Sequence, residues 1–180
     1  MKIKSTLLFA LLFLGCASLS ARSIKAAPAP SDESDVRATV QRVFDQLKTG
    51  QYAALYDALP STSRSRIARD RFVSGLQRTS DFYRLERIEI GAVRVSGNLA
   101  VVDTTMFAHV NKPLDADGKL IVQQYLVRED GNWRVATGDT ATINRFLKAN
   151  PTFARRFPIK RPQAFVNQNG KWVAIPLGRR

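Results

Sequence analysis

The hydrophobic pattern of this chain changes its period once, near residue 83, and this change restricts the folds open to it. Before that point, apolar residues recur every three or four positions, as on helices with one buried face. After it, apolar and polar residues alternate, as on strands that bury one face of a sheet. Helices followed by a meander of strands with short turns predict an α+β fold, with one helical layer on a bent antiparallel sheet.

Three helical segments are predicted before the change of period. The first starts at Ser34, the second covers residues 50–59 and is stopped by Pro60, and the third covers 61–79. The third is expected to break near Asp70, whose side chain is suited to cap a new turn.

Four strands are predicted after it, over residues 85–95, 99–110, 120–128 and 133–136. A further helix is expected over 142–150, a short one from Pro151, and a hairpin over 163–175 around Asn169-Gly170. The resulting division is a folded α+β domain over 34–139 and a helix-plus-hairpin appendage over 140–180.

Three motifs in this order resemble the nuclear transport factor two-like (SnoaL-like) superfamily, especially its small exported bacterial members. They are the helix Gly50-x-Tyr52-x-x-x-Tyr56-x-x-Leu59, the helix from Phe72 to Leu76, and the strand from Asp130 to Val135. The resemblance covers residues 34–139. It implies a cystatin-like cone of helices on a strongly bent sheet, often a homodimer through that sheet. It implies no single function, because the superfamily holds enzymes, ligand binders and assembly domains.

The amino terminus reads as an export signal over residues 1–21, followed by a flexible linker over 22–33. Its apolar stretch is too short to span a bilayer, which needs about 20 residues. Two processing routes are open: cleavage after Ala21, or cleavage before Cys16 at a lipobox-like site with acylation of that cysteine. The expected location is therefore periplasmic or extracellular, with membrane anchoring if Cys16 is lipidated.

Positive charge gathers in the last quarter of the chain. Residues 140–180 hold nine Lys or Arg and no acid, whereas 22–139 hold 17 basic and 15 acidic residues. This asymmetry predicts docking on an anionic lipid or cell-wall polymer. The residues expected to contact that surface are Arg145, Lys148, Arg155, Arg156, Lys160 and Arg161. Nucleic acid is not the expected partner, because the interleaved aromatic residues have the spacing of core contacts and the chain is exported.

The candidates for acid–base catalysis are His109, the only histidine, and Asp103 on the same strand. They lie too far apart along the strand to pair, so a partner for the imidazole has to come from another strand. Glu89 and Gln124 are the candidates, and the sequence leaves the strand register open. The candidate pocket residues are Tyr56, Tyr83, Gln124 and Tyr125.

No metal or cofactor is expected. The sequence has no phosphate-binding glycine loop, no nucleophile elbow and no paired histidines. Its single cysteine, Cys16, lies in the export segment and leaves none for a disulfide or a zinc cluster in the mature fold. The segment Asp115-Ala116-Asp117-Gly118 begins like a calcium loop but lacks the required glutamate, so a turn is expected.

The function that these features favour is a non-catalytic envelope protein that binds a small apolar ligand or a partner protein. One alternative is a small-molecule enzyme of isomerase, dehydratase or hydrolase type that uses the cone pocket. The other is a structural dimerisation module.

Overall fold

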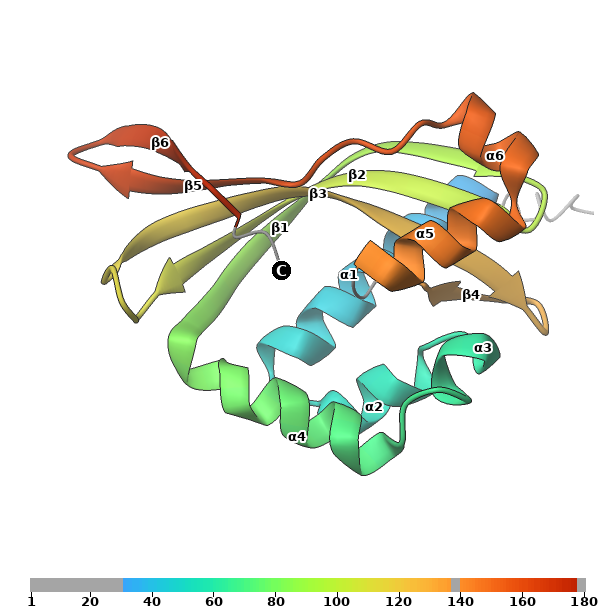
Figure 1. The fold of residues 1–180 in the computed structure, drawn as a ribbon, viewed down its shortest axis with the longest axis horizontal. Coiled ribbons are helices and arrows are strands. Elements are labelled where there is room, and N and C mark those ends of the chain that lie inside the picture. The colour runs from blue at the N-terminus through green and yellow to red at the C-terminus, as the bar shows by residue number, and fades with distance from the viewer. Residues whose placement is uncertain (1–30, 137–139, 178–180) are drawn as a thin grey trace, which may run out of the picture.

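The computed structural model describes residues 31–136 and 140–177, in which four α-helices precede the meander and two follow it (Figure 1). The first half holds the helices α1 (Asp32–Lys48), α2 (Tyr52–Asp57), α3 (Ser61–Arg64) and α4 (Arg69–Thr79) and the 3₁₀ turn η1 (Ser80–Phe82). The meander follows with β1 (Tyr83–Ser96), β2 (Leu99–Val110), β3 (Ala116–Glu129) and β4 (Asn132–Val135). The chain then forms α5 (Thr140–Ala149), α6 (Pro151–Arg156), β5 (Gln163–Gln168) and β6 (Lys171–Ile175). The predicted α+β class is confirmed.

The C-terminal hairpin belongs to the same sheet as the meander. The strand order is β1-β2-β3-β5-β6, and β4 also pairs with β3. One half of β3, Gly118–Ile121, pairs with β5, while the other half, Leu126–Glu129, pairs with β4. Asn169 and Gly170 both have positive φ, which is the turn geometry that this dipeptide predicts. The predicted hairpin is confirmed, and it widens the sheet.

The sheet is curved, and β1 carries two irregularities that favour the bend. Its register against β2 shifts between Leu85 and Arg87 and again between Ile90 and Val93. Gly91 lies in the second shift, where a Cβ atom would meet the Asp103 carbonyl oxygen at 3.1 Å. We call the sheet face toward α1 the concave face and the opposite face the convex face (Figure 1).

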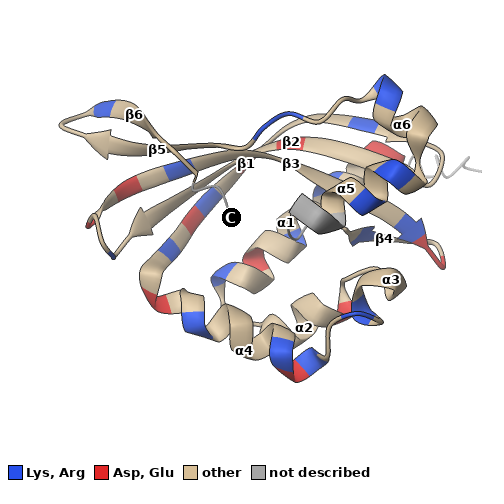
Figure 2. Ribbon diagram, viewed as in Figure 1, with Lys and Arg blue, Asp and Glu red and all other residues tan. Residues whose placement is uncertain are grey.

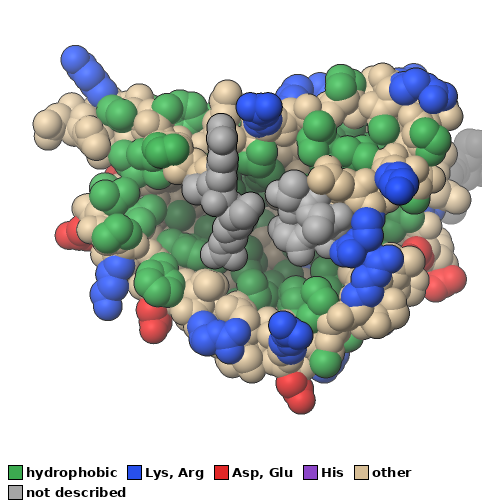
Figure 3. All heavy atoms as spheres, in the orientation of Figure 1, with side chains coloured by type: hydrophobic (Ala, Val, Ile, Leu, Met, Phe, Trp, Pro, Cys, Tyr) green, Lys and Arg blue, Asp and Glu red, His purple; other side chains and the backbone are tan. Residues whose placement is uncertain are grey.

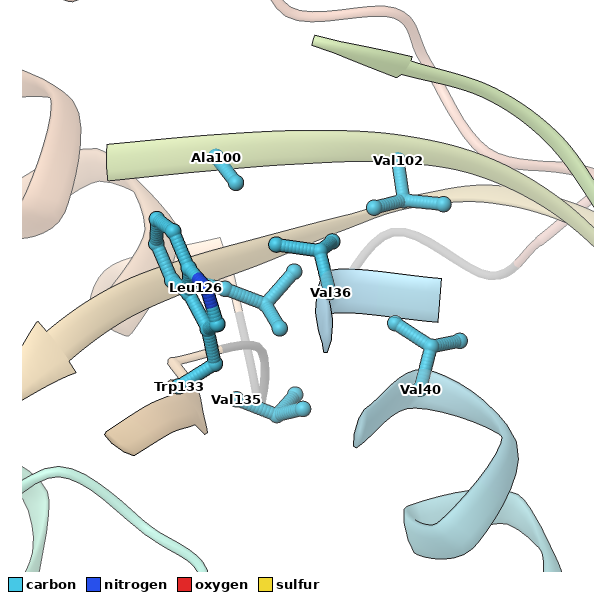
Figure 4. Packing of buried hydrophobic residues seen from close by; sticks show 7 residues of the cluster. All are labelled: Val36, Val40, Ala100, Val102, Leu126, Trp133 and Val135. Atoms are coloured by element: carbon cyan, nitrogen blue, oxygen red, sulfur yellow. The ribbon is translucent and has the colours of Figure 1, made fainter. Parts of the chain in front are cut away.

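Helix α1 packs across the concave face and forms the main core with it. Val36 and Val40 of α1 face strand side chains that are at most 7% exposed (Figure 4). These strand residues are Ala100, Val102, Leu126, Trp133 and Val135. The helix buries one side only, as its spacing of apolar residues requires.

Two helix starts differ from the prediction. Helix α1 begins at Asp32, because the Ser31 hydroxyl accepts a hydrogen bond from the Ser34 N–H at 3.2 Å and caps the first turn. The predicted linker therefore ends earlier than residue 33. Helix α4 begins at Arg69 after Ala68, so Asp70 lies in the first turn and does not cap it.

Helices α5 and α6 cover part of the convex face. Phe146 and Phe153 pack with Val101 and Tyr125, and the rings of Tyr125 and Phe146 are 5.5 Å apart between centroids. These aromatic residues thus fix the appendage to the sheet, as their spacing predicted.

Within the described ranges, no helix is both long and apolar enough to cross a bilayer. The predicted export signal, Cys16 and the linker up to residue 30 lie outside the described residues.

Candidate ligand-binding site

A first cavity of about 280 Å³ lies on the concave face, between the sheet and helices α1, α2 and α4. Its walls are aliphatic and aromatic except for Gln124. Because Gln124 alternates along β3 with the buried Tyr125, it lies on the same face as Leu126 and points toward α1.

A second cavity of about 430 Å³ adjoins the first on the same face. It lies between β1, β2 and β3 on one side and the residues Phe82, Ile175 and Leu177 on the other. Most residues that line this cavity are apolar too, and Tyr83 and Lys112 are among its few polar ones. Lys119 also lines it, but its ammonium lies over the ring of Trp172, 4.6 Å from the centroid.

The two cavities meet at Leu47 and Met106, which line both. In the space-filling view the molecule is hollowed between the sheet above and α4 below, and hydrophobic side chains gather in that hollow (Figure 3). No aspartate or glutamate is among the described residues that line either cavity. The arrangement suits an apolar ligand and offers few groups for chemistry.

The Gln124 amide is the polar group of the first cavity. Among the described residues, no side-chain hydrogen bond involves it, although the residue is half-buried. The amide is not fully buried, so its oxygen and nitrogen are open to a hydrogen bond with solvent or with a ligand. Gln124 can therefore bind one polar group of an otherwise apolar molecule.

The four predicted pocket residues lie in different places. Gln124 lines the first cavity and Tyr83 the second. Tyr56 lines neither, and its hydroxyl is 3.0 Å and 2.9 Å from the carbonyl oxygens of Arg64 and Ile67, where it ties α2 to the following loop. Tyr125 is on the convex face and 1% exposed.

The Tyr125 hydroxyl donates a hydrogen bond to Gln123 Oε1 at 3.0 Å. Burial, with the nearby negative charge of Asp103, raises the pKa of Tyr125 above its ordinary value. This phenol therefore stays neutral and structural.

Asp103 lies at the centre of an ion-pair network on the convex face. Its carboxylate is 2.9 Å from the Arg94 guanidinium and 3.0 Å from the Lys160 ammonium, and it also accepts from the Gln123 amide at 3.3 Å. Partial burial acts to raise the pKa of Asp103, but these hydrogen bonds outweigh it and hold the pKa below its ordinary value. The carboxylate is already neutralised by protein cations.

His109 lies at the loop end of β2, between two carboxylates. Its Nδ1 is 3.0 Å from Asp117 Oδ1, and its Nε2 is 3.0 Å from Asp115 Oδ1. Hydrogen bonds to Asp117 and Asp115 raise the pKa of His109 above 6.5. Both ring nitrogens can donate at once only in the imidazolium form, so the contacts favour the charged ring.

The predicted neighbours of His109 were wrong, because the register of the sheet places them elsewhere. Glu89 lies opposite Thr105, and Gln124 lies opposite Val102. The acids that contact the ring are Asp115 and Asp117, from the segment that begins like a calcium loop. This segment leads into β3, in which Asp117 pairs directly with His109. Within residues 31–136 and 140–177, no group of His, Asp and Glu is arranged to hold a metal ion.

The six predicted surface cations are all exposed. They lie in pairs: Arg145 and Lys148 on α5, Arg155 and Arg156 on α6, and Lys160 and Arg161 in the link to β5 (Figure 2). Lys160 is also engaged with Asp103. The appendage thus presents its basic side chains to solvent while its aromatic residues face the sheet.

The fold and cavities define an α+β domain whose helices and curved sheet enclose an apolar site. This is the architecture that the resemblance to the nuclear transport factor two-like superfamily implies; an exported bacterial origin stays a prediction. No protein-family model matches the chain, and no curated protein matches it.

Several solved structures are similar in fold. Aln2 from a Streptomyces species has a TM-score of 0.44 and 13% identity, over 60% of this chain and 88% of that one. A domain of unknown function with a cystatin-like fold from Nostoc punctiforme has a TM-score of 0.43 and 18% identity, over 71% and 92%. An LEH-like epoxide hydrolase from M. tuberculosis has a TM-score of 0.41 and 14% identity, over 71% and 99%.

Proposed function

We propose that this protein is a non-catalytic binding module that takes an apolar small molecule into the two cavities of its concave face. The observation that carries the proposal is the pair of adjoining apolar cavities, in which Gln124 is the polar side chain of the first. Their volumes, about 280 and 430 Å³, suit a small-molecule site.

The positions of the acid–base candidates support binding over catalysis. An enzyme site needs at least two polar groups that converge on a reacting atom within a pocket. Asp103 and His109 line neither cavity, and both already contact charged partners on their own side of the sheet. The enzyme and dimerisation alternatives stay predictions.

The proposal also places the protein in the cell envelope, after export. There the basic residues of α5, α6 and the following link would hold it against an anionic lipid or cell-wall polymer. All six of these side chains are exposed, which supports this role. Each cation near an anionic surface adds about 1 kcal/mol to the free energy of binding.

The binding proposal is tested by filling the second cavity. Ala108 lines it from β2, so Ala108→Phe places a ring in the space. The control is Thr105→Phe, which adds a ring to the same strand on the convex face. Binding is measured by the fluorescence of a neutral naphthylamine dye, with circular dichroism to show that both variants fold.

We expect Ala108→Phe to weaken dye binding about tenfold or more, the equivalent of about 1.4 kcal/mol, and Thr105→Phe to leave it unchanged. Absence of dye binding to the parent protein, or equal loss in both variants, would contradict the proposal.

A further inference from the structure

We infer that the ligand is a single-chain amphiphile, an unbranched apolar chain that ends in an anionic head group. This inference rests on the proposed function and adds the class of ligand. The head group would bind at the outer end of the second cavity, beside Lys112 and Tyr83, and the chain would run inward past Met106.

The arrangement of the two cavities favours an elongated ligand. The inner end is formed by Ala58, Leu59 and Phe72 of the first cavity, and the outer end by Phe82 and Leu177 of the second. The cavities follow one another along the concave face and meet at Leu47 and Met106. A methionine at the junction suits this path, because its unbranched side chain adapts to a chain that passes it. A compact ligand would fill only one of the two.

The outer end opens to solvent and carries the polar groups. Phe82 at this end is 51% exposed, and Leu177 is 48% exposed. Tyr83 pairs with Val110 in the sheet, and the Lys112 N–H donates to the Phe82 carbonyl oxygen at 3.4 Å. Tyr83 and Lys112 therefore lie on neighbouring segments, and both line this end of the cavity.

The charge at this end favours an anion. Among the described residues, none of the ion pairs includes Lys112. The second cation of the lining, Lys119, has its ammonium over aromatic rings. An exposed, unpaired ammonium beside an apolar cavity can hold a carboxylate or phosphate while the chain is buried.

The inner end excludes a charged group. Its polar side chain is the neutral Gln124, and a charge buried there without an ionic partner would be strongly unfavourable. The head group must therefore stay at the outer end, which fixes the direction of the ligand.

The test compares four ligands that share a twelve-carbon chain: dodecanoate, dodecyl phosphate, dodecanol and dodecylammonium. Each displaces the neutral dye from the purified protein, below its micelle concentration and at low salt. The variants are Lys112→Gln and Tyr83→Phe, and the matched control is Lys148→Gln on the exposed side of α5. Direct dye binding to each protein is measured first, because it reports on the apolar cavity alone.

We expect at least one of the two anions to displace the dye at about fivefold lower concentration than dodecanol, and dodecylammonium to be the weakest. Lys112→Gln should abolish the advantage of the anion, measured as the ratio of the anion and dodecanol displacement concentrations in the same variant, and Lys148→Gln should leave that ratio unchanged. Tyr83→Phe should reduce the advantage in part.

Equal displacement by dodecanol and both anions, or an anion advantage that survives Lys112→Gln, would overturn the inference while the binding function stands. Failure of the dye itself to bind would instead overturn the proposed function.

Discussion

The Lys160 ammonium lies 3.0 Å from the Asp103 carboxylate, although 57 residues separate them along the chain. The Lys160 N–H also donates to Gln123 Oε1 at 2.8 Å. These two contacts join the link between α6 and β5 to the middle of the sheet on the convex face. The basic segment is thereby held in a defined position, on the face opposite the cavities.

Removing the Asp103 charge should destabilise the fold. In Asp103→Asn, Arg94 and Lys160 lose their ionic partner, so we expect the free energy of unfolding to fall by about 1 kcal/mol, a value limited by the exposure of Lys160. Urea unfolding at neutral pH measures it. The control is Asp57→Asn, which breaks the exposed pair with Arg69 and should change stability by less than about 0.5 kcal/mol. Equal losses of stability in the two variants would show that the Asp103 network stabilises the fold no more than an exposed ion pair does.

The core between α1 and the sheet should be sensitive to truncation. Leu126 is 0% exposed and contacts this core, so Leu126→Ala should lower the free energy of unfolding by about 2–5 kcal/mol. Leu114 is 49% exposed, and the same substitution there should cost little. Chemical unfolding of both variants measures the difference. A loss at Leu126 as small as that at Leu114 would show that Leu126 does not lie in the core.

The contacts of His109 predict a pH-dependent stability of the β2–β3 hairpin. Because the folded pKa is raised above 6.5, the stabilising contribution is fully present below pH 6.5 and is lost as the pH rises through the folded pKa. Arg84 lies opposite His109 on β1 and is the cation facing it across the strands. As His109 is the only histidine, a single imidazole signal in NMR spectra reports its titration.

Replacing either acid should lower that pKa. We expect Asp115→Asn and Asp117→Asn each to move the midpoint of the His109 titration downward. Asp130→Asn is the matched control, because Asp130, like Asp115, has a positive φ in a turn between strands. A midpoint at or below 6.5 in the parent protein would rule out the paired geometry.

The exposed cations of α6 should govern binding to anionic surfaces. We expect the double variant Arg155→Glu, Arg156→Glu to weaken cosedimentation with vesicles containing anionic lipid by about tenfold or more at low salt, and less at high salt. Arg71→Glu with Arg78→Glu makes the same change of net charge on exposed positions of α4 and should have a smaller effect. Equal losses would indicate that only net charge matters, and no binding by the parent would end the docking hypothesis.

Much of the fold could be predicted from local pattern. The change of period located the helices and strands, and Asn169-Gly170 located the last hairpin, because these signals depend on residues close in sequence. The start of α1 was misplaced because Ser31 and Ser34 are both suitable caps, and the hydrogen bond chose the first.

The candidate site was harder to predict. Gln124 and Tyr83 were singled out, but so were Tyr56 and Tyr125, which line neither cavity. The difference depends on which way each side chain faces, and a shift of one residue in a strand reverses it.

By itself, the sequence determined the order of elements, the apolar face of α1 and the concentration of positive charge after residue 140, because composition and periodicity carry this information. Only the tertiary structure decided that β5 pairs with β3, that Asp103 meets Lys160, and that Asp115 and Asp117 meet His109. It alone placed the apolar cavities on the face opposite these charged contacts. The physical reason is that strand register and side-chain direction are set by pairing between distant segments, which no local pattern encodes.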